Sequence, residues 1–190
     1  MWRALPLILL VHLAFVLGCK PRLEVPTPPA VQLVTTSIST PDCRRDIDAQ
    51  DPNSLPYLVC AGAAGTTVRV RSVEAGKVSV DLVLPNQRVA PLSLQQHVSR
   101  HMYGLESPLL WRLEQRDGRW QALALVMQVA ERADSDDPAL VTRRIDALAR
   151  VDADGACIVA VRPATHPAVG GDAAWMADAK AQPCAKALPE

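Results

Sequence analysis

The chain has 190 residues, and its 20 basic side chains balance its 20 acidic ones, which gives a formal net charge of zero. A chain of this length ordinarily forms one domain or two small ones. It has no block of clustered basic residues of the kind that binds phosphate backbones, which argues against nucleic acid as a partner. Aromatic side chains make up only 4% of the residues, so we expect a core of mainly aliphatic side chains.

The first eighteen residues are typical of a signal peptide. Arg3 supplies a cationic start, an apolar stretch runs from Leu5 to Leu17, and Gly18 follows. The apolar stretch is shorter than the roughly 20 residues that a membrane-spanning helix needs. We therefore expect residues 1–18 to be removed and the remainder to be exported.

The segment Val16-Leu17-Gly18-Cys19 resembles the lipobox of bacterial lipoproteins. In that family the peptidase cuts before the cysteine and the thiol is acylated, so the resemblance implies lipidation of Cys19. Gly18 matches the small residue before the cut, whereas Leu17 departs from the family, which favours a small residue there. A plain secretory leader is the alternative. Lys20 is not the aspartate that commonly marks inner-membrane retention, which favours anchoring in the outer membrane, facing the periplasm.

Residues 19–40 are expected to form a proline-rich tether. Proline fixes φ and lacks a backbone donor, which favours an extended spacer over packing. Such a spacer would lift a folded domain, expected over residues 41–190, off a membrane. The prolines that carry this interpretation are Pro21, Pro26, Pro28 and Pro29.

Four of the five cysteines fall in the expected domain. Four cysteines allow three pairings, and sequence alone does not choose between them. We favour the pairing in which each bridge closes a short local loop, and such a loop stabilises a fold by about 3 kcal/mol. A redox or metal site is the alternative, but there is no Cys-x-x-Cys and no zinc spacing. Bridges would indicate an oxidising compartment. The favoured pairs are Cys43 with Cys60 and Cys157 with Cys184.

The spacing of apolar residues predicts a hairpin and a helix in the first half of the domain. Apolar and polar residues alternate over Thr66–Val73 and again over Lys77–Leu84, with a glycine-containing break between them. This alternation predicts two paired strands. From Ser93 to Tyr103 the apolar spacing becomes helical, and Gly104 is a natural stop, so we expect a short amphipathic helix.

Asp117-Gly118 is the strongest hairpin signal in the chain, between strands expected over 109–116 and 119–129. A two-residue loop would set Trp111 opposite Ala124. A three-residue loop with a bulge at Gly118 would instead pair odd positions with odd ones. We favour the bulged register, because it brings the large apolar side chains to one face. Those side chains are Leu109, Trp111, Leu113, Leu123, Leu125, Met127 and Val129.

Two further strands, Val141–Val151 and Ala156–Arg162, are expected to pair across Asp152–Gly155, and a terminal helix is expected over Asp172–Gln182. These elements predict an α+β fold. It would consist of a single antiparallel sheet of about six strands with two helices packed on one side.

Candidate chemistry is sparse. His97 and His101 lie four residues apart on the expected helix, so both can face one metal ion, but no third ligand accompanies them. We therefore assign no catalytic residue, no metal site and no cofactor. Asp152-x-Asp154-Gly155 suits a turn better than a calcium loop. The acidic run 134–137 suits a solvated loop tip, with a functional acidic patch as the alternative.

Trp120, beside the hairpin turn, has two interpretations. An exposed tryptophan there could anchor a partner, although packing across the strands is the commoner use.

Several short segments together resemble a diffuse group of uncharacterised exported bacterial proteins with two disulfides. The resemblance implies the disulfide pairing favoured above, and it implies no activity. The segments are Cys43, Leu58-Val59-Cys60, Leu110-Trp111-Arg112, Ala156-Cys157-Ile158-Val159-Ala160, Ala177-Asp178 and Pro183-Cys184.

We therefore expect a non-enzymatic binding module of the cell envelope, held to a membrane through an N-terminal lipid. Its partner would be a protein or another envelope component. Two alternatives stay open: a periplasmic hydrolase or metal-dependent enzyme that uses His97 and His101, and a structural envelope component.

Overall fold

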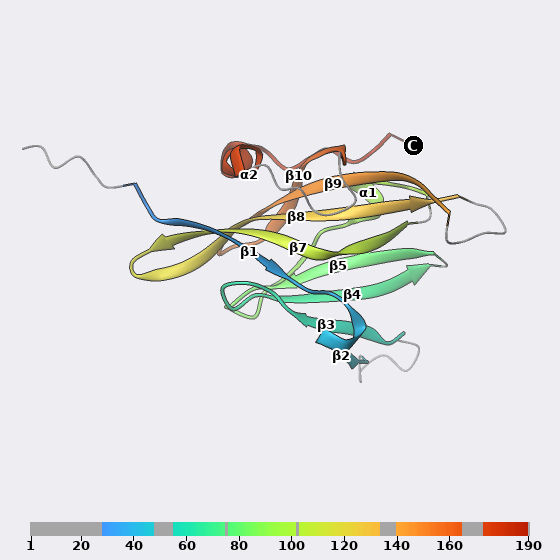
Figure 1. Cartoon of the computed structure of the whole chain (residues 1–190), viewed down its shortest axis with the longest axis horizontal. Coiled ribbons are helices and arrows are strands. Elements are labelled where there is room, and N and C mark those ends of the chain that lie inside the picture. Colours follow the sequence, from blue (N-terminus) through green and yellow to red (C-terminus); the bar gives the residue numbers. More distant parts are fainter. Residues whose placement is uncertain are drawn as a thin grey trace, which may run out of the picture.

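The computed structural model describes residues 28–47, 55–74, 76–101, 103–133, 140–164 and 173–189. These residues form two antiparallel sheets of five strands each (Figure 1). Sheet A has the order β1 (Val31–Thr36), β7 (Tyr103–Arg116), β8 (Arg119–Arg132), β9 (Val141–Val151), β10 (Ala156–Pro163). Sheet B has the order β2 (Cys43–Asp46), β3 (Tyr57–Ala61), β4 (Thr67–Glu74), β5 (Lys77–Val83), β6 (Val89–Pro91).

The expected single-sheet α+β fold is therefore wrong. Alternation along a strand reports which of its faces is buried, but not which other strands share its sheet. The two sheets bury their inner faces against each other in one apolar cluster, which makes a sandwich. Its fully buried members include Val68, Val80 and Leu82 from sheet B and Trp111, Leu125 and Met127 from sheet A.

Helical structure is limited in the described residues. The helix α1 covers only Leu94–His97, and the 3-10 turn η1 covers Thr40–Asp42. The helix expected over Ser93–Tyr103 is thus cut short, because Tyr103 belongs to β7 and is buried in the inner core. The terminal helix is present as α2 (Ala173–Ala177), which continues into the 3-10 turn η2 (Asp178–Ala181).

The terminal helical segment forms a third layer on the outer face of sheet A. Met176 of α2 and Ala179 of η2 pack on Leu110, Val126 and Leu148 in a second apolar cluster. Figure 1 shows α2 lying beside the β8–β10 side of this sheet. The helices are thus not both packed on one sheet face as expected, because α1 contacts β5 of sheet B.

The strand β1 lies within the range expected to be tether. It pairs along its whole length with β7, from Val31 opposite Glu114 to Thr36 opposite Leu109. The Trp111 indole Nε1 donates a hydrogen bond to Thr36 Oγ1 at 2.8 Å. Folded structure therefore begins before residue 41.

The β7–β8 hairpin combines both expected registers. Asp117 and Gly118 have φ values of 49° and 73°, and Arg116 pairs with Arg119, so the loop has two residues and no bulge at Gly118. The register shifts farther along, where Leu123 is left without a Cα partner. Beyond this shift Trp111 pairs with Leu125, so odd positions face odd ones and the large apolar side chains reach the inner core.

Two disulfides staple the fold, and they are the favoured pairs Cys43–Cys60 and Cys157–Cys184. The first joins the opposed residues of β2 and β3. The second ties β10 to residues 183–189, which we call the C-terminal strap. Disulfides indicate an oxidising compartment, and hence an exported protein.

The C-terminal strap runs from the edge of sheet A to α1. The Ala185 amide donates to the Ile158 carbonyl at 2.7 Å, and the Leu188 amide donates to the Gln96 carbonyl at 2.7 Å. Arg100 also donates to the Leu188 carbonyl, at 2.6 Å. The strap therefore connects sheet A with the α1 segment that follows sheet B.

Gly62 provides a direct test of inner-core packing. A Cβ at this position would lie 2.7 Å from the Thr66 carbonyl oxygen and 3.1 Å from the Trp111 ring. We expect Gly62→Ala to lower the free energy of unfolding by roughly 1–3 kcal/mol through overpacking. Urea unfolding measures this loss. Gly155→Ala is the matched control, because nothing lies within 4 Å of its Cβ position; equal stabilities of the two variants would contradict the close contact.

The second disulfide gives another test. Replacing Cys157 and Cys184 together by serine should cost about 3 kcal/mol of unfolding free energy, since the reduced chain regains the entropy of an open loop. Thermal unfolding, compared with the Cys43→Ser/Cys60→Ser variant, measures the loss. If the Cys157→Ser/Cys184→Ser variant is as stable as the unmodified chain, the strap is held in place without its bridge.

Candidate functional site: a cleft at the mouth of the sandwich

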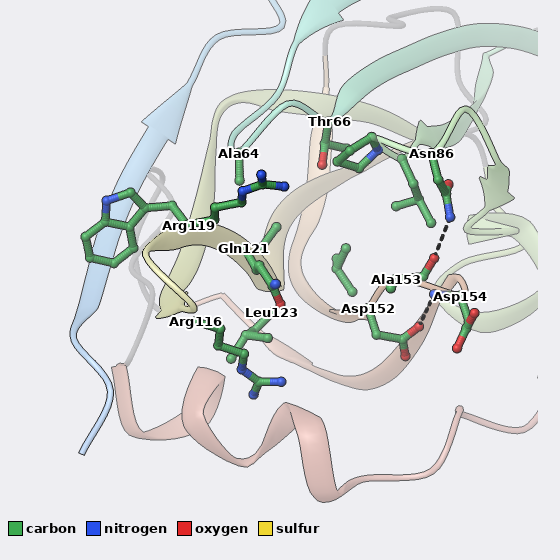
Figure 2. A pocket seen from close by; sticks show the side chains of 15 residues that line it. Ala64, Thr66, Asn86, Arg116, Arg119, Gln121, Leu123, Asp152, Ala153 and Asp154 are labelled. Carbon is green, nitrogen blue, oxygen red and sulfur yellow. Dashed lines mark hydrogen bonds between the residues drawn. The ribbon is translucent and has the colours of Figure 1, made fainter. Parts of the chain in front are cut away.

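A cleft of about 540 Å³ opens at one end of the sandwich, and we call it the mouth cleft (Figure 2). Turns from both sheets gather there. The β3–β4 and β5–β6 turns come from sheet B, and the β7–β8 and β9–β10 turns come from sheet A. The lining residues are Ala64, Thr66, Leu84, Pro85, Asn86, Arg116, Arg119, Trp120, Gln121, Ala122, Leu123, Val151, Asp152, Ala153 and Asp154.

Tight hydrogen bonding fixes the sheet B side of the mouth cleft. The Gly62 amide donates to the Thr66 carbonyl at 2.9 Å, and the Thr66 amide donates to the Ala63 carbonyl at 3.0 Å. Ala64 and Gly65 take positive φ values of 51° and 76° to close this turn. The glycine-rich stretch 62–65 is therefore a strand-to-strand turn that lines the cleft.

The β9–β10 turn is equally well defined. Asp152 Oδ1 accepts the amides of Asp154 and Gly155, each at 2.9 Å, which confirms the expected turn. Asn86 Nδ2 donates to the Ala153 carbonyl at 2.8 Å (Figure 2). This bond ties the β5–β6 turn of sheet B to the β9–β10 turn of sheet A, so the two walls of the cleft are held together.

The mouth cleft has a cationic wall and an anionic wall. Arg119 points toward the cleft beside Ala64, whereas Arg116 points to the other side of the hairpin (Figure 2). The Arg116 guanidinium is paired with Glu114, while the Arg119 side chain makes no hydrogen bond or ion pair with the described residues. On the opposite wall, the Asp154 side chain is 94% exposed and pairs with Arg88 at 3.3 Å.

Apolar surface lies between these charges. Leu84 is almost fully buried, Leu123 is half-buried, and the ring of Pro85 lies beside them in the lining. Trp120 on the hairpin is 39% exposed. The cleft thus offers guanidinium, carboxylate and amide groups around an apolar floor, which is the chemistry of ligand binding.

No protein-family model matches this chain, and the curated proteins and solved structures give no significant match. The mouth cleft must therefore be interpreted from its own chemistry.

The two histidines singled out from the sequence do not form a shared helical face. His97 is the last residue of α1, and His101 lies beyond the helix. The His97 ring Nδ1 lies 3.4 Å from the Lys186 carbonyl oxygen of the strap. Within the described ranges, no group of three or more histidine, cysteine or acidic side chains is placed to hold a metal ion.

Two other sequence interpretations lie outside the described residues: acylation at Cys19 and the acidic run 134–137. Among the helices that the structure describes, none has the length and apolar character needed to cross a bilayer.

An ion pair between a buried glutamate and a largely exposed arginine lies at the opposite end of β8. Glu131 is 4% exposed, and Arg143 donates to its two carboxylate oxygens at 2.7 and 2.9 Å. The hydrogen bond from Arg143 holds the pKa of Glu131 below its usual value, with smaller contributions from Ser99 and the positive charge of His101, against the effect of burial. This cluster joins β8, β9 and the segment after α1.

The pH dependence of stability follows from this lowered pKa. Because the folded state favours the ionised carboxylate, the stabilisation is complete above the unfolded-state pKa of about 4.5 and is lost as pH falls through the lower folded-state pKa. We expect Glu131→Gln to be less stable than the unmodified chain at neutral pH, and the two to converge in acid. Urea unfolding between pH 7 and pH 3 measures the unfolding free energy of the two chains. A difference between them that stays the same at every pH would contradict this role of Glu131.

A polar cluster on the outer face of sheet A had no signal in the sequence. Gln128 and Asp146 are both buried, and Gln128 Nε2 donates to Asp146 Oδ1 at 3.1 Å. Arg162 Nε lies 3.5 Å from Asp146 Oδ2, and its guanidinium stacks 3.9 Å from the Trp175 ring. The cluster links three neighbouring strands to α2 and thereby positions the third layer.

Proposed function

We propose that the protein is an exported binding module, held to a membrane through a lipid on Cys19, which binds a protein or another envelope component in the mouth cleft. The cleft itself carries the proposal. Its volume of about 540 Å³ falls in the range of roughly 300–1,000 Å³ typical of ligand pockets, and an apolar floor with few polar groups is the usual composition of such pockets.

The rigidity of the cleft supports this proposal. Asn86 joins turns of different sheets, and Asp152 fixes its own turn through two backbone amides. A preformed site loses little conformational entropy on binding. The free guanidinium of Arg119 and the exposed ring of Trp120 then provide groups that are common in binding hot spots.

Site-specific photo-crosslinking tests the proposal in the producing cell. A photoreactive phenylalanine derivative at position 120 should form a defined adduct, and Arg119→Glu in the same chain should abolish it, because the cationic wall is reversed. The matched control places the same group at Leu140, which is 53% exposed at the other end of β8–β9. Equal adducts from positions 120 and 140 would refute binding at the mouth cleft.

Mass spectrometry of the protein purified from the producing cell tests the proposed lipid anchor. The intact mass should correspond to a chain that begins at Cys19 and carries a lipid. A mass that includes residues 1–18 would refute the anchor.

A further inference from the structure

The sheet order places the start of the folded chain at the same end as the mouth cleft. The first strand β1 is antiparallel to β7, so Val31 lies opposite Glu114, near the β7–β8 turn. The Gln115 amide donates to the Ala30 carbonyl at 2.9 Å, which extends this pairing one residue farther. Figure 1 shows the start of β1 and the β7–β8 turn at the same end of the molecule.

We infer that the mouth cleft faces the membrane and binds the zwitterionic headgroups of its phospholipids. This inference rests on the proposed anchor at Cys19. From Cys19 to Ala30 the chain has few residues, and in an extended proline-rich conformation it would reach about 35 Å. Such a tether limits how far the chain-entry end can move from the bilayer, and it places no such limit on the opposite end of the domain.

The charges at the cleft fit a headgroup that carries both signs. The Arg119 guanidinium has no ion-pair partner in the described residues and can accept a phosphate, which arginine binds well. Asp154 lies on the facing wall with its side chain 94% exposed, so its carboxylate can receive the ammonium of the same headgroup beside its exposed pair with Arg88, which contributes little. The Asp152 carboxylate is not available in the same way, because it accepts two backbone amides and lies 3.6 Å from Arg150. Leu123 and the ring of Pro85 provide apolar surface for the carbon atoms between and below these charges.

Trp120 adds an interfacial group at the same place. Its side chain is 39% exposed on the hairpin that projects beside the cleft. Tryptophan concentrates at membrane–water interfaces, where its ring lies at headgroup depth. The hairpin therefore presents an aromatic and a cationic side chain next to each other at the end from which the tether leaves.

Quenching by brominated lipids tests this orientation. The chain from Cys19 onward has one cysteine outside the two disulfides, so Cys19 can be coupled to a maleimide lipid whether or not the cell acylates it. On vesicles of brominated phosphatidylethanolamine and phosphatidylcholine, tryptophan emission should be quenched. Trp120→Phe should remove this quenching, whereas Trp175→Phe, which changes a ring on the outer face of sheet A, should leave it intact.

A charge-reversal pair tests headgroup binding on the same vesicles. Arg119→Glu should weaken the quenching, and Arg44→Glu, at a side chain 69% exposed on sheet B, should not.

Two results on the vesicles overturn the inference: quenching that survives Trp120→Phe, and the complete absence of quenching in the unmodified chain. A soluble charged peptide such as Lys-Leu-Asp provides a further comparison. If this peptide changes the Trp120 emission and the brominated lipids do not quench it, the membrane orientation is overturned, but the proposed binding module still stands. Failure of the crosslinking experiment alone would instead reject the protein partner.

Discussion

The packing of the two inner sheet faces against each other is the contact on which the rest of this fold depends. Trp111 lies at its centre, fully buried, with its indole nitrogen bonded to Thr36 of β1 and its ring against the Gly62 turn of sheet B. One side chain thus joins the first strand, the central hairpin and the opposite sheet. The mouth cleft begins where this packing ends: Leu123, at which the β8 register shifts, lines the cleft and is not part of the inner core cluster.

Local patterns predicted the strands with long alternation and missed those without it. The expected strands at Thr66–Val73, Lys77–Leu84 and Val141–Val151 correspond closely to β4, β5 and β9. The missed strands are short or rich in arginine and proline, as in Cys43–Asp46 and Val89–Pro91, so they carry little periodic signal. Pairing with a neighbour creates these strands, and such long-range pairing is not encoded in the local pattern.

The candidate site was predictable only in parts. The Asp152 turn and the position of the Asp117-Gly118 turn were each accessible from the sequence, whereas Trp120, for which packing across the strands was the favoured interpretation, is 39% exposed. Their meeting at one cleft was not, because it depends on how two sheets stack. Conversely, the helical spacing of His97 and His101 was misleading, since burial of Tyr103 in the core draws this part of the chain into β7.

The C-terminal strap has a consequence for how copies of this protein behave beside one another. Strand β10 is the outer strand of sheet A, and exposed outer strands invite edge-to-edge association between molecules. The strap covers the start of that strand, where it is bonded to Ile158 and bridged to Cys157. By occupying this part of the edge it blocks the approach of a second sheet there, which matters most where many copies are crowded on one surface.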